Sequence, residues 1–251
     1  MHNTPWLVRQ TAAQARLRLY CFSYAGGNAG NFAPWQAALD PAIEVCAVQL
    51  PGRGGRFGEA PYTSLSALVE ALAQVISHQD KLPFAFFGHS LGGLLGFEVA
   101  RFCQRHFLPM PKHLIVSGCA APRLRKTERQ LHLLDDEALI EELKTYNGTP
   151  PAVLASRELM ALLLPMIRAD FSMVETYQYR VAPLLELPIT VLAGTGDDHV
   201  SQEQVDGWKS ETTHACHSLW FEGDHFFLHP QRAAVLARVD DVLRELTLVS
   251  R

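Results

Sequence analysis

Short apolar segments alternate with longer amphipathic segments along most of the chain. Each short segment has the length of a strand, is rich in β-branched or aromatic residues, and is bounded by Gly, Pro or Asn, which predicts a β-strand. The segments are apolar at successive positions, as is typical of parallel strands that helices cover on both faces. The predicted strands are Leu17–Ser23, Val45–Leu50, Phe84–Gly88, His113–Gly118, Ile189–Gly194 and Ser218–Glu222.

The longer segments carry apolar residues at spacings of three and four, which is the pattern of a helix that buries one face. This pattern predicts helices over Ser64–Ser77, Ser90–His106 and Gln231–Leu246. Strands and helices in alternation predict an α/β fold, with an open, mostly parallel sheet, right-handed crossovers and flanking helices.

One segment, about residues 121–187, interrupts this alternation. It contains no strand pattern, only helical patterns over Leu133–Tyr146 and Ser156–Tyr179, and it is too long for a simple connection. We therefore predict a single domain over residues 1–251, with a helical lid inserted at about 121–187 over one edge of the sheet.

Composition narrows the class of protein. The 251 residues are 48% hydrophobic and have a net charge of −4, which gives no electrostatic basis for binding nucleic acid or an anionic membrane. Five scattered cysteines without a C-x-x-C pair are typical of reduced thiols. The N-terminal stretch lacks the apolar core of a signal peptide, and no apolar run approaches the ~18 residues of a membrane span. We expect a cytoplasmic protein, by default a monomer.

The stretch Gly88-His89-Ser90-Leu91-Gly92 matches G-x-S-x-G, the nucleophile elbow, in which a strained turn between a strand and a helix presents a serine. A buried serine at a helix N-cap is the structural alternative. Because a predicted strand precedes this stretch and a predicted helix follows it, the context favours Ser90 as a nucleophile. The neighbouring His89 is assigned a structural role, since adjacent side chains on a tight turn diverge.

A nucleophilic serine needs a base, and the base needs an orienting acid, in the chain order serine, acid, histidine. His225, in the loop after the last predicted strand, is the best-placed base. Asp197 and Asp198 both follow the strand Ile189–Gly194, so spacing does not choose between them as the acid.

An oxyanion hole requires two backbone amides. Leu91, directly after Ser90, supplies one, and the loop after the first predicted strand supplies the other from Tyr24 or Ala25. A phosphate cradle is disfavoured in this glycine-rich loop because no Gly-Lys-Ser/Thr follows. Donor loop, serine, acid and histidine in this order predict an α/β-hydrolase fold.

The chain also resembles the stand-alone (type II) thioesterases that serve nonribosomal peptide and polyketide synthetases. The resemblance covers nearly the whole chain in order, and it rests on CFSYAGGNAGNF, VQLPGRGGRFGE, FFGHSLGG, RADFSMVETYQY and GDHFFL. It implies that Ser90 is the nucleophile, His225 the base and Asp197 the acid. It also implies that the amides of Ala25 and Leu91 form the oxyanion hole.

The sequence departs from the family pattern at a few places. Ser23 replaces the proline usual before Tyr-Ala-Gly-Gly, and Asp198 stands where the family often has proline. The opening antiparallel strands of the wider fold are expected to be absent, because the sequence before Leu17 is short.

The function implied by the resemblance is hydrolysis of misprimed or stalled acyl or aminoacyl groups from the phosphopantetheine arm of carrier proteins. The pathway would make a polyketide or a nonribosomal peptide, with a siderophore-type peptide favoured. The resemblance implies no metal and no cofactor, since the arm belongs to the substrate. The alternatives are a general carboxylesterase, a hydrolase-fold protein that only binds, and a terminating thioesterase, although the last is normally fused to a synthetase.

Three further groups of residues have predicted roles. Arg53 and Arg56, in PGRGGR, are expected to hold a loop rather than to contact substrate. A basic cluster at the lid hinge is a candidate docking face for an acidic carrier protein, with a solvated hinge as the alternative. The cluster consists of Arg123, Arg125, Lys126 and Arg129, and the predicted lining of the acyl chamber consists of Leu139, Leu143, Leu159, Leu162, Met166, Phe171 and Met173.

Overall fold

A single sheet of seven strands organises the computed structural model, which describes residues 4–10, 12–79, 82–125 and 130–249. The strand order is β1-β3-β2-β4-β5-β6-β7, and neighbouring strands are parallel except for β1, which runs antiparallel to β3. The strands are β1 Leu7–Arg9, β2 Leu17–Phe22, β3 Ile43–Val48, β4 Phe84–His89, β5 Leu114–Ser117, β6 Ile189–Gly194 and β7 Cys216–Phe221.

All six predicted strands are present, with β3 and β7 each beginning two residues earlier than predicted. The expectation that opening antiparallel strands are absent is wrong for β1, which pairs with β3 from Leu7 opposite Val48 to Arg9 opposite Cys46. A strand of three residues shows no apolar pattern of its own, and it is held by its backbone ladder to β3.

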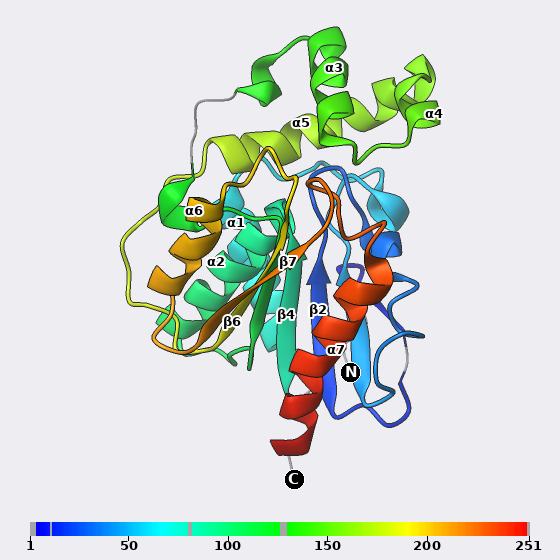
Figure 1. Cartoon of the computed structure of the whole chain (residues 1–251). Helices are drawn as coiled ribbons and strands as arrows, with labels where there is room; N and C mark the ends of the chain where they lie inside the picture. Colours follow the sequence, from blue (N-terminus) through cyan, green and yellow to red (C-terminus); the bar gives the residue numbers. More distant parts are fainter. Residues whose placement is uncertain (1–3, 11, 80–81, 126–129, 250–251) are drawn as a thin grey trace.

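Helices cover both faces of the sheet (Figure 1). Helices α1 and α2 pack on one face, and α7 packs on the other, so that the core is divided into two layers by the sheet. None of the helices within the described ranges is long and apolar enough to cross a membrane. The helices are α1 Leu65–Ser77, α2 Leu91–Arg105, α3 Asp136–Tyr146, α4 Pro151–Leu154, α5 Arg157–Glu175, α6 Gln202–Asp206 and α7 Arg232–Val249.

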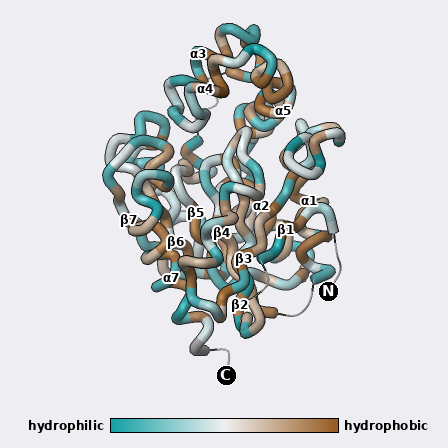
Figure 2. Tube along the Cα trace, turned by 90° about the vertical axis from the view of Figure 1, so that its right-hand side faces the viewer, coloured by the Kyte–Doolittle hydropathy of each residue, from teal (hydrophilic) through white to brown (hydrophobic). Residues whose placement is uncertain are grey.

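The predicted insertion lies between β5 and β6 and contains α3, α4 and α5. These helices lie beyond the carboxyl ends of the parallel strands, as two views at right angles show (Figures 1 and 2). They pack on one another through a small apolar cluster of their own, which includes Leu139, Leu164 and Phe171. The lid therefore sits where the loops of an open α/β sheet form a site.

His113 lies directly before β5, at the amino end of the sheet. Its Nε2 lies 2.9 Å from the hydroxyl of Thr190, and burial lowers the pKa of His113 from its usual 6.5 to about 4. Between pH 6.5 and about pH 4, His113 is protonated in the unfolded chain but neutral in the folded protein. The folded protein therefore loses stability as the pH falls through this range.

Replacing His113 with glutamine should flatten the pH dependence of stability. The wild type is expected to lose about 2 kcal/mol more than His113→Gln between about pH 7 and about pH 5, because only the wild type must keep this ring neutral. Urea unfolding at both pH values measures the difference. Parallel losses in the two proteins would show that the pKa of His113 is not depressed.

Candidate active site

Ser90 stands at the turn between β4 and α2 with backbone angles φ 55° and ψ −115°. A non-glycine residue in this left-handed region is strained, and such strain is retained where the surroundings fix it. Here the Ser90 amide donates to the carbonyl oxygen of Ser117 at 2.8 Å, which anchors the turn to β5. The strand, strained turn and helix predicted from the sequence are therefore present.

Two glycines make this turn possible by allowing close backbone contacts. A Cβ added at Gly88 would lie 2.1 Å from the carbonyl oxygen of Gly92. A Cβ added at Gly92 would lie 2.1 Å from the carbonyl oxygen of Phe22. The start of α2 thus packs directly on the ends of β2 and β4, at a distance that only glycine permits.

His225 and Asp197 form a buried pair, and His225 lines the same cavity as Ser90. The Nδ1 of His225 lies 2.8 Å from Oδ2 of Asp197, and the two side chains are 4% and 1% exposed. The other carboxylate oxygen accepts the amide of His199 at 2.8 Å. Because the carboxylate accepts the Nδ1 proton, the Nε2 atom is left as the basic nitrogen, and it has no hydrogen-bond partner among the described residues.

The structure separates the two acids that spacing left equivalent. Asp197 is turned inward onto His225, whereas Asp198 is exposed and forms no described bond to the imidazole. Asp224, the immediate neighbour of His225, accepts the amide of Phe226 and the side chain of Asn147. Of these three carboxylates, Asp197 is therefore the one that bonds to the imidazole.

Ser90 and His225 line a cavity of about 600 Å³ beneath the lid. The lid contributes one face of α5 to the wall, with residues spaced by three or four positions, together with residues from α3 and α4. These lid residues are Leu143, Tyr146, Val153, Leu163, Ile167, Phe171, Val174 and Glu175. Most of the lid residues in this wall are apolar, which suits an acyl chain, and Glu175 is the one carboxylate among those from the described part of α5.

Only Leu143 and Phe171, of the seven predicted chamber residues, line this cavity. Leu139 and Met166 are buried within the lid, and Met173 is buried against the sheet core. Leu159 and Leu162 point outward and are 45% and 56% exposed. The prediction is wrong for these five residues. The spacing of apolar residues predicts a helix with an apolar face, but it does not predict which of those residues will point into the cavity.

The end of α3 attaches the lid to the loops that hold the acid and the histidine. Tyr146 stacks on His199, with ring centroids 3.8 Å apart and planes 3° from parallel. The next residue, Asn147, donates to Asp224 at 3.0 Å from a left-handed backbone conformation. These contacts fix the roof of the cavity above His225.

The loop after β2 contains the two residues, Tyr24 and Ala25, predicted to supply the second amide of an oxyanion hole. The amide of Gly26 donates to Asp170 at 2.8 Å, and that of Gly27 donates to the carbonyl oxygen of Tyr24 at 2.9 Å. The amides of Tyr24 and Ala25 thus remain as donors of this turn, while Leu91, as the first residue of α2, has an amide without an intrahelical acceptor.

Both arginines of the PGRGGR loop have the structural role that was predicted. Arg53 forms a two-pronged ion pair with Asp170, with N–O distances of 2.6 and 2.8 Å. Arg56 bonds to Glu59 and lies over the ring of Trp6, 4.0 Å from its centroid. Asp170 is the residue of this site that sequence reasoning missed, and its only signal was the RADF motif.

His89 is fully buried behind the site, in agreement with its predicted structural role. Its Nδ1 lies 2.9 Å from the hydroxyl of Ser117, and its ring centroid is 5.2 Å from that of His225. Burial and the neighbouring His225 hold the pKa of His89 well below its usual value, so the His89 ring that packs against His225 is neutral.

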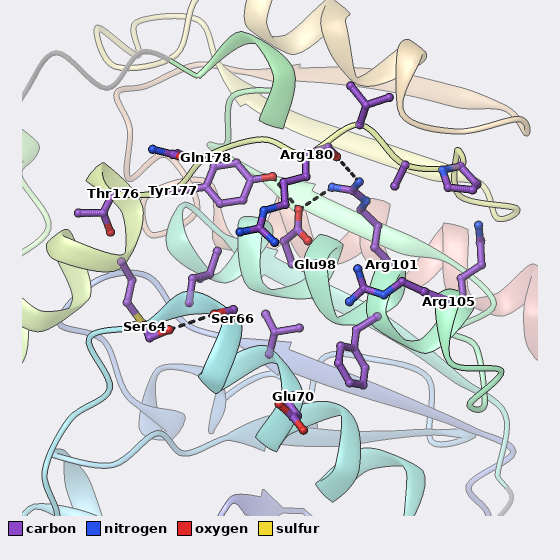
Figure 3. Close-up of a pocket in the computed structure, with 18 of the residues that line it drawn as sticks. Ser64, Ser66, Glu70, Glu98, Arg101, Arg105, Thr176, Tyr177, Gln178 and Arg180 are labelled. Carbon is purple, nitrogen blue, oxygen red and sulfur yellow. Dashed lines mark hydrogen bonds and ion pairs between the residues drawn. The ribbon is translucent and has the colours of Figure 1, made fainter.

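A larger cavity, of about 1030 Å³, lies between α1, α2 and the segment that follows α5 (Figure 3). Near its centre Glu98 accepts bonds from Tyr177 at 2.6 Å and from Arg101 at 2.8 Å. Neither Ser90 nor His225 lines it. The smaller cavity under the lid, which both residues line, is therefore the candidate active site.

The basic cluster divides between two environments. Arg123 is half exposed, bonds to the hydroxyl of Tyr179 at 3.1 Å and lies 3.7 Å from Glu211. Arg125 lines the cavity under the lid. Lys126 and Arg129 lie outside the described residues.

Comparison with known proteins agrees with this geometry. A sequence model of the thioesterase domain matches residues 17–243. The chain belongs to the thioesterase family. This thioesterase is 40% identical to the gramicidin S biosynthesis protein GrsT of Aneurinibacillus migulanus, over 97% of this chain and 94% of GrsT.

Two solved structures of similar proteins have the same fold. The type II thioesterase BorB, from the borrelidin biosynthetic cluster, is 36% identical with a TM-score of 0.88 and covers 96% of this chain and 98% of its own. The thioesterase RedJ, from the prodiginine pathway of Streptomyces coelicolor, is 37% identical with a TM-score of 0.85 and 92% coverage of each chain. The predicted α/β-hydrolase fold and thioester hydrolysis are thereby confirmed.

Proposed function

We propose that this thioesterase removes misprimed or stalled acyl and aminoacyl groups from the phosphopantetheine arms of carrier proteins in nonribosomal peptide or polyketide synthesis. The observation that supports it most strongly is the buried Asp197–His225 pair. His225 and Ser90 line one cavity, and the Nε2 atom of His225 has no described hydrogen-bond partner. The pathways named for GrsT, BorB and RedJ support the choice of carrier-bound substrates.

Acylation begins when the Ser90 hydroxyl attacks the thioester carbonyl carbon while Nε2 of His225 takes the hydroxyl proton. Asp197 holds the imidazole in the required tautomer and stabilises the imidazolium. The amides of Ala25 and Leu91 donate to the oxyanion of the tetrahedral intermediate. The imidazolium then returns the proton to the departing sulfur, which leaves an acyl-serine and a free carrier thiol.

Deacylation repeats these steps with water as the nucleophile. His225 takes a proton from the water, the same two amides stabilise the second oxyanion, and Ser90 leaves with the proton that His225 returns. The reaction as proposed uses side chains, backbone amides and water, and the phosphopantetheine belongs to the substrate.

Presenting one short acyl group on three supports tests this proposal. The supports are a carrier protein, a small thiol such as N-acetylcysteamine, and a matched oxyester, each measured with wild type and Ser90→Ala. Preference for the carrier thioester, lost in Ser90→Ala, is the expected result. Equal or faster turnover of the oxyester would instead identify a general carboxylesterase.

We also propose that Arg123 belongs to the face that docks the carrier. Carrier proteins are usually acidic, so Arg123→Gln is expected to raise KM for the carrier substrate by roughly fivefold at low salt and by less at high salt. KM for the small thioester should not change. Arg238→Gln, an exposed change on α7 over the opposite face of the sheet, is the matched control. Equal effects on both substrates would contradict docking at Arg123.

A further inference from the structure

Asp170 connects three segments that are distant in the sequence. It lies on lid helix α5, its side chain is 0% exposed, and it pairs with Arg53, which is 5% exposed, through both carboxylate oxygens. The Oδ2 atom also accepts the amide of Gly26 at 2.8 Å. The lid, the PGRGGR loop and the loop that holds Ala25 therefore meet at one carboxylate.

These bonds fix the direction of the peptide groups in the loop after β2. Gly26 has φ +78°, and a Cβ at this position would lie 3.2 Å from Cγ1 of Ile167, so α5 packs directly on the loop. The Gly26 amide is held by Asp170, and the Gly27 carbonyl oxygen is held by Arg53 at 3.2 Å. The Ala25 amide belongs to the Tyr24–Ala25 peptide, whose carbonyl oxygen accepts the Gly27 amide at 2.9 Å. Holding Gly26 and Gly27 in place therefore keeps the Ala25 amide in one orientation.

The charges of the pair also suit a neighbouring oxyanion. A carboxylate is a stronger acceptor for the Gly26 amide than a neutral group, because charge-assisted hydrogen bonds are shorter and stronger. Alone, a buried carboxylate close to the site would oppose the negative charge that develops on the substrate oxygen. The bidentate guanidinium of Arg53 offsets that charge, so Asp170 holds the loop without repelling the oxyanion.

We propose that Asp170 is a positioning residue that ties the lid helix α5 to the oxyanion loop, so that the Ala25 amide is aimed at the substrate only while α5 is seated on that loop. The inference rests on the proposed function, since it takes the Ala25 amide as an oxyanion donor.

Asp170→Asn tests the proposal with a matched control. Glu44→Gln breaks a second deeply buried arginine–carboxylate pair, Arg18–Glu44, which joins the amino ends of β2 and β3 away from the cavity. Asp170→Asn should lower kcat for a small thioester about a hundredfold, the size of effect expected when one oxyanion donor is lost, with KM nearly unchanged. Glu44→Gln should retain kcat even where its melting temperature falls as far.

A second readout separates positioning from a general loss of structure. A trifluoromethyl ketone analogue of the acyl group binds as an oxyanion on Ser90, whereas a thioether analogue binds without one. Asp170→Asn is expected to weaken trifluoromethyl ketone binding by the same factor as kcat and to leave thioether binding unchanged. Equal weakening of both analogues, or unchanged ketone binding, would overturn the proposal.

Arg53→Lys provides a milder variant in case Asp170→Asn does not fold. It keeps the positive charge but loses the two-pronged bond, so it should show the same pattern with a smaller fall in kcat. A fall in kcat with ketone binding unchanged would again count against positioning. Failure of the proposed function would appear separately, as wild-type protein that does not turn over the thioester.

Discussion

Replacing Asp197 with asparagine is expected to lower kcat/KM for a thioester by about four orders of magnitude, whereas Asp198→Asn should change it by less than about threefold. The Asp197 carboxylate accepts the Nδ1 proton of His225 at 2.8 Å, inside a pocket where both side chains are buried. An asparagine amide can donate to Nδ1 instead, which places the imidazole proton on Nε2. The ring can then no longer take the proton of Ser90.

A small thioester is the appropriate substrate for this comparison, because it removes any effect of carrier docking. Retention of the melting temperature by Asp197→Asn would show that the loss is chemical. The Asp198→Asn variant is matched in chemistry, and it differs in that Asp198 is exposed and has no described bond to the imidazole. If both variants lost activity to the same extent, Asp197 would not be the orienting acid.

Gly92→Ala is expected to cost about 3 kcal/mol or more of folding free energy, together with most of the activity. The added methyl would lie 2.1 Å from the carbonyl oxygen of Phe22 and 2.8 Å from that of Ser23, and a backbone atom cannot rotate out of the way. Helix α2 would have to move away from the end of β2, which would separate Ser90 and the Leu91 amide from the loop that holds Ala25.

Urea unfolding and thioester turnover measure these two losses. Gly58→Ala is a matched control, because a Cβ at Gly58 has no other atom within 4 Å. A Gly92→Ala protein as stable and active as Gly58→Ala would show that the elbow does not need this close approach.

The central sheet could be predicted from the sequence because strands β2 to β6 are buried on both faces and leave nearly continuous apolar runs. The edge strand β7 is only partly buried, and its prediction rested on its aromatic residues and the glycine that follows. Strand β1 escaped notice because three residues show no period and pairing with β3 decides their conformation. The order of serine, acid and histidine follows from the chain path of the fold. The choice between Asp197 and Asp198 did not follow from position, since adjacent residues differ only in the direction that the turn gives their side chains.

Residues that act across the fold were harder to find. Asp170 and Arg53 are separated by 117 positions, and nothing in either local pattern shows that the two will meet. A single aspartate within an amphipathic helix is also usually a solvent-facing position. The prediction of the chamber residues was mostly wrong for a related reason. Which face of α5 lines the cavity depends on contacts between distant segments, such as that of Ile167 with the loop at Gly26.

The wall of the cavity formed by Leu163, Ile167 and Phe171 lies on an insertion, whereas Ser90, Asp197 and His225 lie on the ends of sheet strands or just beyond them. The lid's part of the cavity wall and the three reacting side chains therefore lie on separate elements, which α5 joins through Asp170 and Ile167 at the loop that holds Ala25. Substitutions at Leu163 and Phe171, which are not part of the contact between Ile167 and Gly26, can alter the size of acyl group that the cavity admits while Ser90, Asp197 and His225 keep their geometry. Such a division allows the acyl specificity of an editing thioesterase to change during evolution while its catalytic residues stay the same.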